Sequence, residues 1–529
     1  NEVVQIENQK QAARQVSVSN SIGSLRFLNA TDWKAFVEQE STIEKILKQD
    51  IDGVYGEMDF YTRDNYRHVV EKLSKCSERS EPEVAALAIE LSAQNRNEDR
   101  KKHVGYFLVD KGLKKLENVV KAKLPFGDRL RKGITEKPLF WYLAAIALFT
   151  FLLCWFILSA DHVYPLKNWQ LYLLAFFGCI AASQSAIILV NWISNLLITP
   201  HPLPKMDYSK GIPENHKTLV VVPTMLGTIE EIDKLTEALE VRFIANRDAN
   251  LYFALLTDFK DACEEHSAGD EKLLTHVQNS IQELNQRYGS NEGGMFMLFH
   301  RPRKWNPKEK LWMGYERKRG KLEELNALLR GNSNTGFSVI IGDEKIFPQI
   351  KYVITLDTDT QLPRESAWKM IATLSHPLNK AEYSTAKQRV TNGYTILQPR
   401  VSNSLPGERS SLYARIHGNE PGVDPYTLTT SDVYQDLFKE GSFIGKGIYD
   451  VDMFIHALDG RFPENRILSH DLIEGAYARS GFLSDVQLYE EYPSTYFADM
   501  KRRHRWIRGD WQIARWLFPF VPSPQKQYR

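Results

Sequence analysis

The sequence predicts an α/β protein whose mostly parallel sheet is preceded by a membrane-spanning helical hairpin and an all-helical N-terminal region. Two uncharged apolar runs, residues 138–160 and 169–198, indicate the hairpin. Beyond it, apolar strand-like runs alternate with amphipathic helical runs, the pattern of a parallel sheet covered on both faces. Before the hairpin only helical periodicity is found. The expected domains are residues 1–124, 125–204 and 205–529.

The composition excludes several classes of protein. With 529 residues, of which 43% are hydrophobic and 25% charged, the chain is not composed like a disordered protein, and it has room for several domains of roughly 150 residues. It has 67 Lys and Arg against 66 Asp and Glu, so no nucleic-acid partner is expected. Four widely spaced cysteines argue against a zinc module or a disulfide framework. Because the chain begins at Asn1 without a signal-like segment, we expect a part of a longer protein.

The N-terminal region, residues 1–124, carries no recognisable chemistry. Segments such as AFVEQESTIEKILKQD and RHVVEKLSKC place apolar residues at three- and four-residue spacing, which predicts amphipathic helices. Packing of these helices on one another explains the pattern. A docking or regulatory role is the alternative.

The run at 138–160 is long enough to span a bilayer, because 23 helical residues reach about 34 Å against a hydrocarbon core of roughly 30 Å. Only 161–168 separates it from the second run, so the two form a hairpin that returns to the same side of the membrane. The alternative is a pair of buried helices in a soluble protein, which the aromatic residues Trp141, Trp169 and Trp192 argue against. Basic residues outside the hairpin place both flanking domains in the cytoplasm. They are Lys121, Lys123, Arg129, Arg131, Lys132, Lys137, Lys205, Lys210 and Lys217, against Lys167 in the connecting loop.

Strand-like runs are predicted at 218–226, 251–258, 295–300 and 352–360, with helices between them at 229–244, 273–288 and 321–331. In parallel sheets ligands bind beyond the carboxyl ends of the strands. Asp258, Asp357 and Asp359 all fall at such ends. We therefore expect the site there.

The pair Asp357 and Asp359 forms a D-x-D directly after an apolar strand. Two carboxylates at one strand exit suit Mg²⁺ or Mn²⁺ shared with substrate phosphates, where the cation would stabilise a departing diphosphate. An acidic turn without function is the alternative. Neither a P-loop nor a G-x-G-x-x-G motif after a strand is present.

A second motif, Ser469-His470-Asp471, is followed by Glu474. One of the carboxylates could deprotonate an acceptor hydroxyl. Taken alone, the spacing fits better with a helix N-cap, in which Ser469 or Asp471 caps the helix and Glu474 completes a capping box. Metal binding by His470 and Asp471 would need further ligands.

A third segment, residues 501–516, interleaves basic residues with tryptophans. One interpretation is an amphipathic helix at the membrane surface. The other uses arginine to bind a diphosphate and tryptophan to stack on a sugar ring. Both hold together if the site lies near the membrane.

Taken in order, these motifs resemble those of the processive, inverting, membrane-bound glycosyltransferases of the cellulose-synthase type. The sequence around them resembles cyclic β-1,2-glucan synthases more closely still. The resemblance runs from about residue 20 to the end. The matching phrases are SIGSLRFLNATDW, GVYGEMDFYTRDNYRHVVEKL, HVGYFLVDKG, GSFIGKGIYDVDMF, SHDLIEGAYARSGF and KRRHRWIRGDWQ.

The resemblance implies a GT-A-like nucleotide-sugar transferase domain and a set of donor-binding residues. Asp258 would contact the uracil of UDP-glucose, and Lys318 of Lys318-Arg319-Gly320 would stand where relatives have the lysine of a K-A-G motif. Asp357 and Asp359 would hold the nucleotide and the metal. Thr224 and Arg503 are also expected at the nucleotide sugar.

The resemblance further implies that Asp471 is the general base, in the position of the aspartate of a T-E-D motif, with Glu474 beside it. Arg505 and Trp506 would match the Arg-Trp of a Q-R-x-R-W motif, although Arg502 replaces the expected Gln. A rival placement of that motif is residues 512–516. The acceptor would meet Trp506, His470 and the loop 441–447, in which Gly445 and Lys446 are the expected contacts.

The expected function is transfer of glucose from UDP-glucose with inversion, which builds a β-1,2-glucan. The cofactor would be Mg²⁺ or Mn²⁺, and the location a bacterial inner membrane with the transferase domain in the cytoplasm. Further partners implied by the family are the lipid bilayer, a protein-linked primer for the growing glucan, and downstream membrane and glycoside-processing domains. The alternatives are a synthase of another linear polysaccharide and a catalytically silent nucleotide-binding scaffold.

Overall fold

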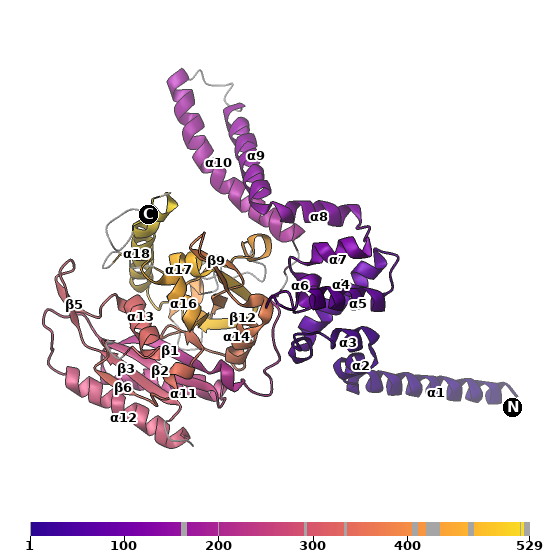
Figure 1. Cartoon of the computed structure of the whole chain (residues 1–529), viewed down its shortest axis with the longest axis horizontal. Helices are drawn as coiled ribbons and strands as arrows, with labels where there is room; N and C mark the ends of the chain where they lie inside the picture. Colours follow the sequence, from indigo (N-terminus) through magenta and orange to yellow (C-terminus); the bar gives the residue numbers. More distant parts are fainter. Residues whose placement is uncertain are drawn as a thin grey trace. The chain divides into compact units, whose positions relative to one another are not determined.

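The computed structural model describes residues 2–159, 167–198, 200, 202–289, 294–332, 336–404, 411–418, 434–463, 470–518 and 520–522. It divides into two compact units, Asn1–Pro125 and Phe126–Arg529 (Figure 1).

The N-terminal unit is helical, as the sequence predicts. A buried carboxylate, Glu44, helps to hold it together: its oxygens accept hydrogen bonds from Tyr55, Arg63 and Arg67. Three buried donors satisfy a charge that would otherwise be costly inside a protein. Its helices are α1 (Glu2–Ala30), α2 (Trp33–Glu40), α3 (Thr42–Leu47), α4 (Phe60–Lys75), α5 (Glu81–Gln94), α6 (Gly105–Val109) and α7 (Leu113–Val120), with a 3₁₀ turn, η1 (Tyr55–Glu57).

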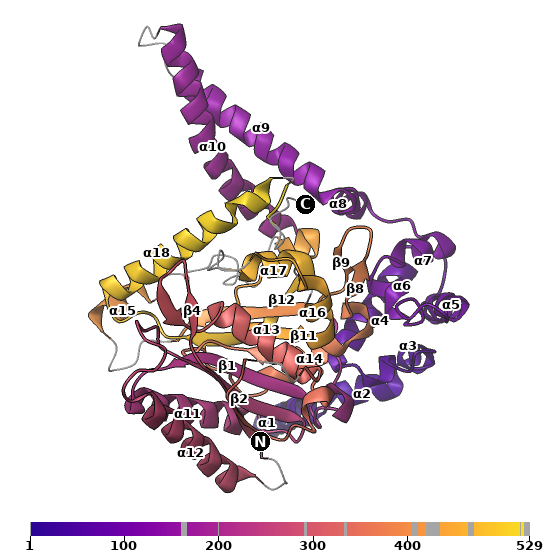
Figure 2. The same cartoon turned by 60° about the vertical axis from the view of Figure 1, so that its left-hand side comes forward.

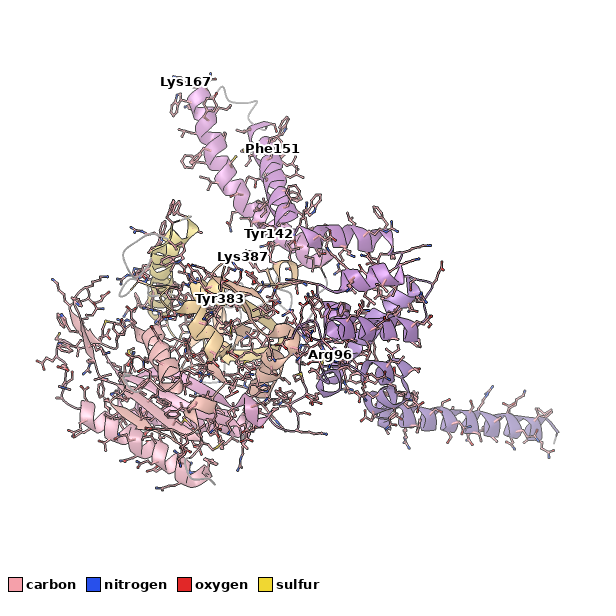
Figure 3. All side chains as sticks on the ribbon, viewed as in Figure 1. Arg96, Tyr142, Phe151, Lys167, Tyr383 and Lys387 are labelled. Carbon is pink, nitrogen blue, oxygen red and sulfur yellow. The ribbon has the colours of Figure 1, made fainter. Side chains whose placement is uncertain are left out.

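The second unit begins with a short helix, α8 (Phe126–Glu136), and two long apolar helices, α9 (Pro138–Ser159) and α10 (Asn168–Leu197). Both are long and apolar enough to cross a membrane, and they pack against each other. The hydroxyl of Tyr142 donates a hydrogen bond of 2.8 Å to Asn191, which joins the two helices near one end of the pair. Figure 3 shows Tyr142, Phe151 and Lys167 spread along the hairpin.

The rest of the unit is built on an eight-stranded sheet in the order β12-β10-β11-β7-β1-β2-β3-β6. Figure 2 labels β12, β11, β1 and β2 of this sheet. Its central strands, β7, β1, β2 and β3, are parallel. The strands are β1 (Thr218–Leu226), β2 (Leu251–Phe259), β3 (Phe296–Arg301), β6 (Val339–Ile341), β7 (Tyr352–Thr355), β10 (Ile396–Asn403), β11 (Gly447–Asp450) and β12 (Ser480–Glu490). Two small hairpins add β4 (Lys304–Asn306), β5 (Leu311–Met313), β8 (Glu382–Ser384) and β9 (Arg389–Asn392).

Helices cover both faces of the sheet, and strand residues are therefore buried on each side. On one face Phe253 and Phe296 pack around Phe243 of α11. On the other, Val221 and Leu256 belong to the cluster that includes residues of α13 and α16. The helices are α11 (Ile229–Ala245), α12 (Asp270–Tyr288), α13 (Arg317–Leu329), α14 (Ser366–Ser375), α15 (Leu412–His417), α16 (Val451–Leu458), α17 (Asp471–Ala478) and α18 (Tyr496–Ile513). Short turns are η2 (Glu214–His216), η3 (Phe347–Gln349), η4 (Pro377–Asn379), the π-helical η5 (Tyr434–Phe438) and η6 (Ala514–Leu517).

Most predicted elements appear within a few residues of their expected bounds, but the strand predicted at 352–360 is shorter in the structure. It ends at Thr355. The D-x-D lies in a turn instead, in which the hydroxyl of Thr360 accepts a hydrogen bond from the backbone N–H of Asp357. Short polar side chains compete for backbone groups in this way and end strands.

Candidate active site

The carboxyl ends of β1, β2 and β7 lie at one edge of the sheet, because the three strands are parallel neighbours. Thr224 pairs with Thr257, and Asp258 follows near the end of β2. Asp357 comes two residues after β7 ends. The structure therefore gathers these predicted residues at the expected edge.

Asp258 is buried among positive charges. Arg301 donates two hydrogen bonds to its carboxylate, at 2.9 and 3.1 Å, and the ammonium of Lys321 lies 3.1 Å away. Lys321 also donates to the backbone oxygen of Thr224. Burial lowers the pKa of Lys321 to about 8, against the attraction of Asp258. Arg301 and Lys321 were not predicted, although Arg301 stands at a strand end and Lys321 directly follows the Lys-Arg-Gly motif.

Asp357 is held by two lysines. The ammonium of Lys318 lies 2.6 Å from Oδ1, and that of Lys446 lies 3.3 Å from Oδ2. Although burial raises the pKa of Asp357, these two charges hold it well below its usual range. Lys318 and Lys321 are three residues apart, hence on one face of α13, so this helix contacts both Asp357 and Asp258.

Asp359 has a different environment. Its carboxylate, that of Asp357 and that of Glu490 at the end of β12 lie within 4.8 Å of one another. Burial, then Glu490 and Asp357, raise the pKa of Asp359, which is the effect of like charges held together. Lys446 lies 2.5 Å from Glu490. Three clustered carboxylates are ligands that suit Mg²⁺ or Mn²⁺, so the residues fit the expected cation. Glu490 belongs to no sequence motif and is marked only by its position at the end of a strand.

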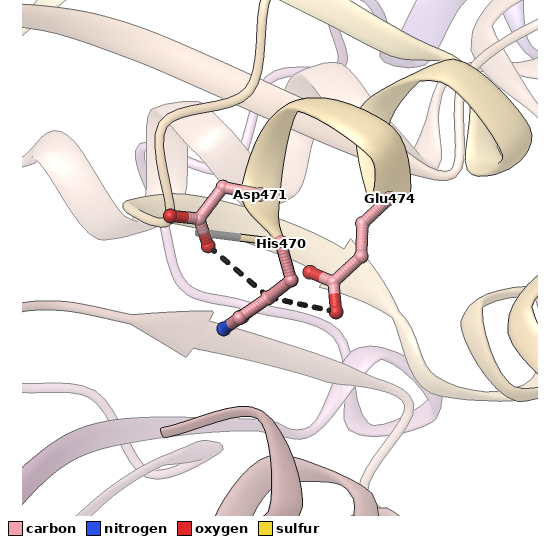
Figure 4. A group of neighbouring side chains, drawn as sticks. All are labelled: His470, Asp471 and Glu474. Atoms are coloured by element: carbon pink, nitrogen blue, oxygen red, sulfur yellow. Dashed lines mark ion pairs between the residues drawn. The ribbon is translucent and has the colours of Figure 1, made fainter. Parts of the chain in front are cut away.

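Asp471 opens α17 and lies against the loop predicted to meet the acceptor. A Cβ at Gly445, whose φ is +84°, would come within 2.8 to 2.9 Å of its carboxylate, so only glycine allows this approach. Nδ1 of His470 lies 3.5 Å from Asp471 and 2.9 Å from Glu474 (Figure 4). These three predicted residues therefore form one cluster.

The structure does not support the form of the capping interpretation in which Asp471 is the cap. The N-cap of α17 is His470, which makes no side-chain capping bond, and Asp471 is the first helical residue. Ser469 lies outside the described residues. The carboxylate of Asp471 therefore is not committed to capping, and its Oδ1 is buried without a hydrogen-bond partner among the described residues.

The Arg-Trp segment forms α18. Arg503 donates to Asp499 at 2.9 Å, and the guanidinium of Arg502 lies 5.0 Å from the ring centroid of Trp506. Arg505 is exposed, and none of the contacts recorded for the described residues joins Arg505 or Trp506 to Asp471.

The rival segment, residues 512–516, contacts the helix that Asp471 opens. Ile513 lies in a buried apolar cluster with Ile473 of α17, and Trp516 packs against that apolar cluster. The contacts in this structure leave the working Arg-Trp pair open between the two placements.

Lys318 joins the Asp357 side of the site to the Gly445 loop, because its ammonium also donates to the backbone oxygen of Gly445 at 2.7 Å. Gly445 in turn lies against Asp471. Asp357 lies beside two lysines, and Asp471 has an oxygen without a hydrogen-bond partner among the described residues. Such a pair suits a group transfer in which a negatively charged group leaves near the lysines and Asp471 takes a proton.

No family model matches the chain. In sequence, the chain is 38% identical over 527 residues, 98% of its length, to the cyclic beta-(1,2)-glucan synthase NdvB of Rhizobium meliloti strain 1021. It spans 18% of the length of that relative. This confirms the resemblance drawn from the motifs.

Proposed function

We propose that the chain transfers glucose from UDP-glucose to a growing β-1,2-glucan, because over 98% of its length it is 38% identical to a cyclic β-1,2-glucan synthase. The relative's printed name supports the product, and the chain corresponds to only part of that relative. The observation that carries the proposal is the link from Asp357 through Lys318 and Gly445 to Asp471. It joins a diphosphate-type site to a candidate base.

In this proposal the sheet and its covering helices act as a GT-A-like domain. The diphosphate of the donor lies against Lys318 and Lys446, which would exchange Asp357 for phosphate oxygens. The uridine lies toward Thr224 and Asp258, near the carboxyl ends of β1 and β2. Arg503 and Arg505 of α18 are further candidates for the diphosphate.

Asp357 and Asp359, with Glu490, would hold Mg²⁺ or Mn²⁺. When bound, such a cation supplies positive charge that stabilises the departing diphosphate.

Transfer is a single in-line displacement. The 2-hydroxyl oxygen of the acceptor glucose forms a bond to C1 of the donor glucose, while the bond from C1 to the phosphate oxygen breaks and UDP leaves with its electrons. Asp471 takes the hydroxyl proton. An α-linked donor thereby yields a β-linked product, and no protein nucleophile is needed. The side chain of Asp471 is 26% exposed, which supports its role as the proton acceptor.

The acceptor lies against the loop that contains Gly445 and Lys446. His470 and Glu474 border the base, and Trp506 is the candidate stacking surface for the acceptor sugar.

We further propose that α9 and α10 anchor the chain in a bacterial inner membrane, with the transferase domain in the cytoplasm. The length and apolar composition of both helices support this, together with the basic residues on their flanks. The bilayer, a protein-linked primer and downstream processing domains are then its partners.

The test compares the full-length protein that contains this chain with its Asp471→Asn variant, in membranes supplied with labelled UDP-glucose and Mn²⁺. We expect labelled 2-linked glucose from the parent, and a loss of about 10²- to 10⁴-fold in the variant with UDP binding retained. Label in another linkage would favour a different polysaccharide synthase. UDP-glucose binding without incorporation in the parent would favour a nucleotide-binding scaffold.

A further inference from the structure

We propose that Glu474 and His470 act together as a positioning pair for Asp471: Glu474 forms an ion pair with the imidazole and keeps it charged, and the charged ring holds Asp471 in the ionised form that accepts a proton. This rests on the proposed function, because Asp471 is the base of that reaction.

The geometry places the histidine between the two carboxylates (Figure 4). Nδ1 of His470 lies 2.9 Å from Oε1 of Glu474 and 3.5 Å from Oδ1 of Asp471, within ion-pair distance of both, although it makes no hydrogen bond to either. The side chains of His470 and Glu474 are 7% and 5% exposed, whereas that of Asp471 is 26% exposed. Only the last member of the array is open to a substrate.

Glu474 is a buried carboxylate, so leaving it without a charged partner would destabilise the fold. A carboxylate at this depth is stable only when it is paired, and removing one partner of a buried pair is strongly destabilising. The nearest cation recorded for Glu474 is His470. Glu474 therefore favours the charged form of the ring, and among the described residues this ring is the cation that lies within 4 Å of the Asp471 carboxylate.

The pKa directions agree with this arrangement. Burial by itself lowers the pKa of His470, but Glu474 and Asp471 outweigh it and raise that pKa above its usual value. Burial raises the pKa of Asp471, and His470 opposes this rise more strongly than any other charge. The charged and titratable groups that face the array from other elements are Lys318, Arg319 and Glu323 of α13, Asp357 after β7 and Tyr449 of β11.

The consequence for pH dependence follows from the sign of each charge. Replacing Glu474 by Gln removes the charge that keeps His470 protonated, so the ring becomes neutral near neutral pH. Asp471 then loses its strongest electrostatic support, a larger effect than the lost repulsion from Glu474. Its pKa rises, and the base is ionised only at higher pH.

The test is the pH profile of glucose transfer by the full-length protein in membranes. In Glu474→Gln and His470→Gln we expect the acidic limb to move up by about one pH unit or more, the effect of losing an opposite charge within about 4–6 Å. Glu474→Asp keeps the charge and should restore part of the shift. Glu271→Gln, an exposed carboxylate in the first turn of α12, is the matched control and should leave the limb in place.

A second readout does not depend on transfer. Because the pKa of His470 is raised, its ion pair stabilises the fold fully below about pH 6.5 and less as pH rises through the raised value. The difference in Tm between the parent and Glu474→Gln should therefore shrink as pH increases.

An acidic limb that stays in place in Glu474→Gln, with a folded protein and normal UDP binding, would overturn the proposal and leave a purely structural role. A pH-independent Tm difference would count against it in the same way. No transfer by the parent would instead defeat the proposed function, while the Tm comparison would still test the ion pair.

Discussion

The ammonium of Lys318 lies 2.6 Å from Oδ1 of Asp357, and the same ammonium donates to the backbone oxygen of Gly445 at 2.7 Å. One side chain thus connects the turn after β7 with the loop that touches Asp471. If Lys318 moved toward a diphosphate, it would weaken its contacts with both the turn and the loop.

Lys318→Met should weaken UDP-glucose binding by about tenfold to a hundredfold, because a charged hydrogen-bond donor of this kind contributes roughly 1.5–3 kcal/mol. Calorimetric titration of the purified protein with UDP measures this. Lys272→Met, on the exposed side of α12, is the matched control and should bind normally. Equal affinity of Lys318→Met and the parent would remove Lys318 from the donor site.

Gly445→Ala should abolish most of the transfer activity, because the new methyl group would press on the carboxylate of Asp471. A left-handed φ costs a non-glycine residue roughly 1–2 kcal/mol, so this strain must be separated from the contact. Gly460→Ala provides the control, since Gly460 has φ +62° and a Cβ added there would meet nothing within 4 Å. We expect similar losses of stability but a loss of activity, about tenfold or more, only at Gly445.

Asp359→Asn should weaken Mn²⁺ binding by about tenfold or more, because it removes one carboxylate from a cluster of three. Electron paramagnetic resonance of added Mn²⁺ measures the free ion directly, without reference to activity. Asp233→Asn, an exposed acid of α11, should bind Mn²⁺ as the parent does. Chelation should stop transfer by the parent, and readdition of Mn²⁺ should restore it.

Arg301→Met should destabilise the fold by about 3–5 kcal/mol, because it leaves the buried carboxylate of Asp258 short of its main partner. Thermal unfolding of the detergent-solubilised protein tests this. Arg287→Met breaks the more exposed pair with Glu240 and should leave Tm almost unchanged. Similar Tm values for the two variants would contradict a structural role for the Asp258 cluster.

His300 should make stability fall at acidic pH. Burial lowers its pKa to about 4, so the folded protein keeps it neutral while the unfolded chain takes up a proton near pH 6.5. Stability is therefore lost as pH falls from about 6.5 to about 4, by on the order of 3 kcal/mol. His300→Gln should flatten the decline in Tm over that range, whereas exposed His68→Gln should follow the parent.

Local patterns accounted for most of the fold. The apolar runs at 138–160 and 169–198 became α9 and α10, and the runs at 218–226 and 251–258 became β1 and β2. These predictions succeeded because buried parallel strands and apolar helices carry continuous signals in the sequence. The end of β7 was missed, since it depends on a hydrogen bond between Thr360 and Asp357.

The candidate site was only partly visible. Asp357 and Asp471 carry motif signals, and their roles stay predictions, as do the roles of Arg505 and Trp506. Glu490, Arg301 and Lys321 carry none, because an isolated charged residue at a strand or helix end looks like any exposed one. Their importance arises from burial beside other charges.

The sequence by itself determined the order of helices and strands, the similarity to cyclic β-1,2-glucan synthases and the kinds of residue at the edge of the sheet, because these depend on periodicity and on motifs along the chain. The tertiary structure alone decided which charged side chains form ion pairs with one another. The pairing of Lys318 with Asp357, and of His470 with Glu474 beside Asp471, depends on how α13, α17 and the Gly445 loop pack against that edge. Electrostatic interactions depend on distance and burial, and neither can be read from spacing along a chain.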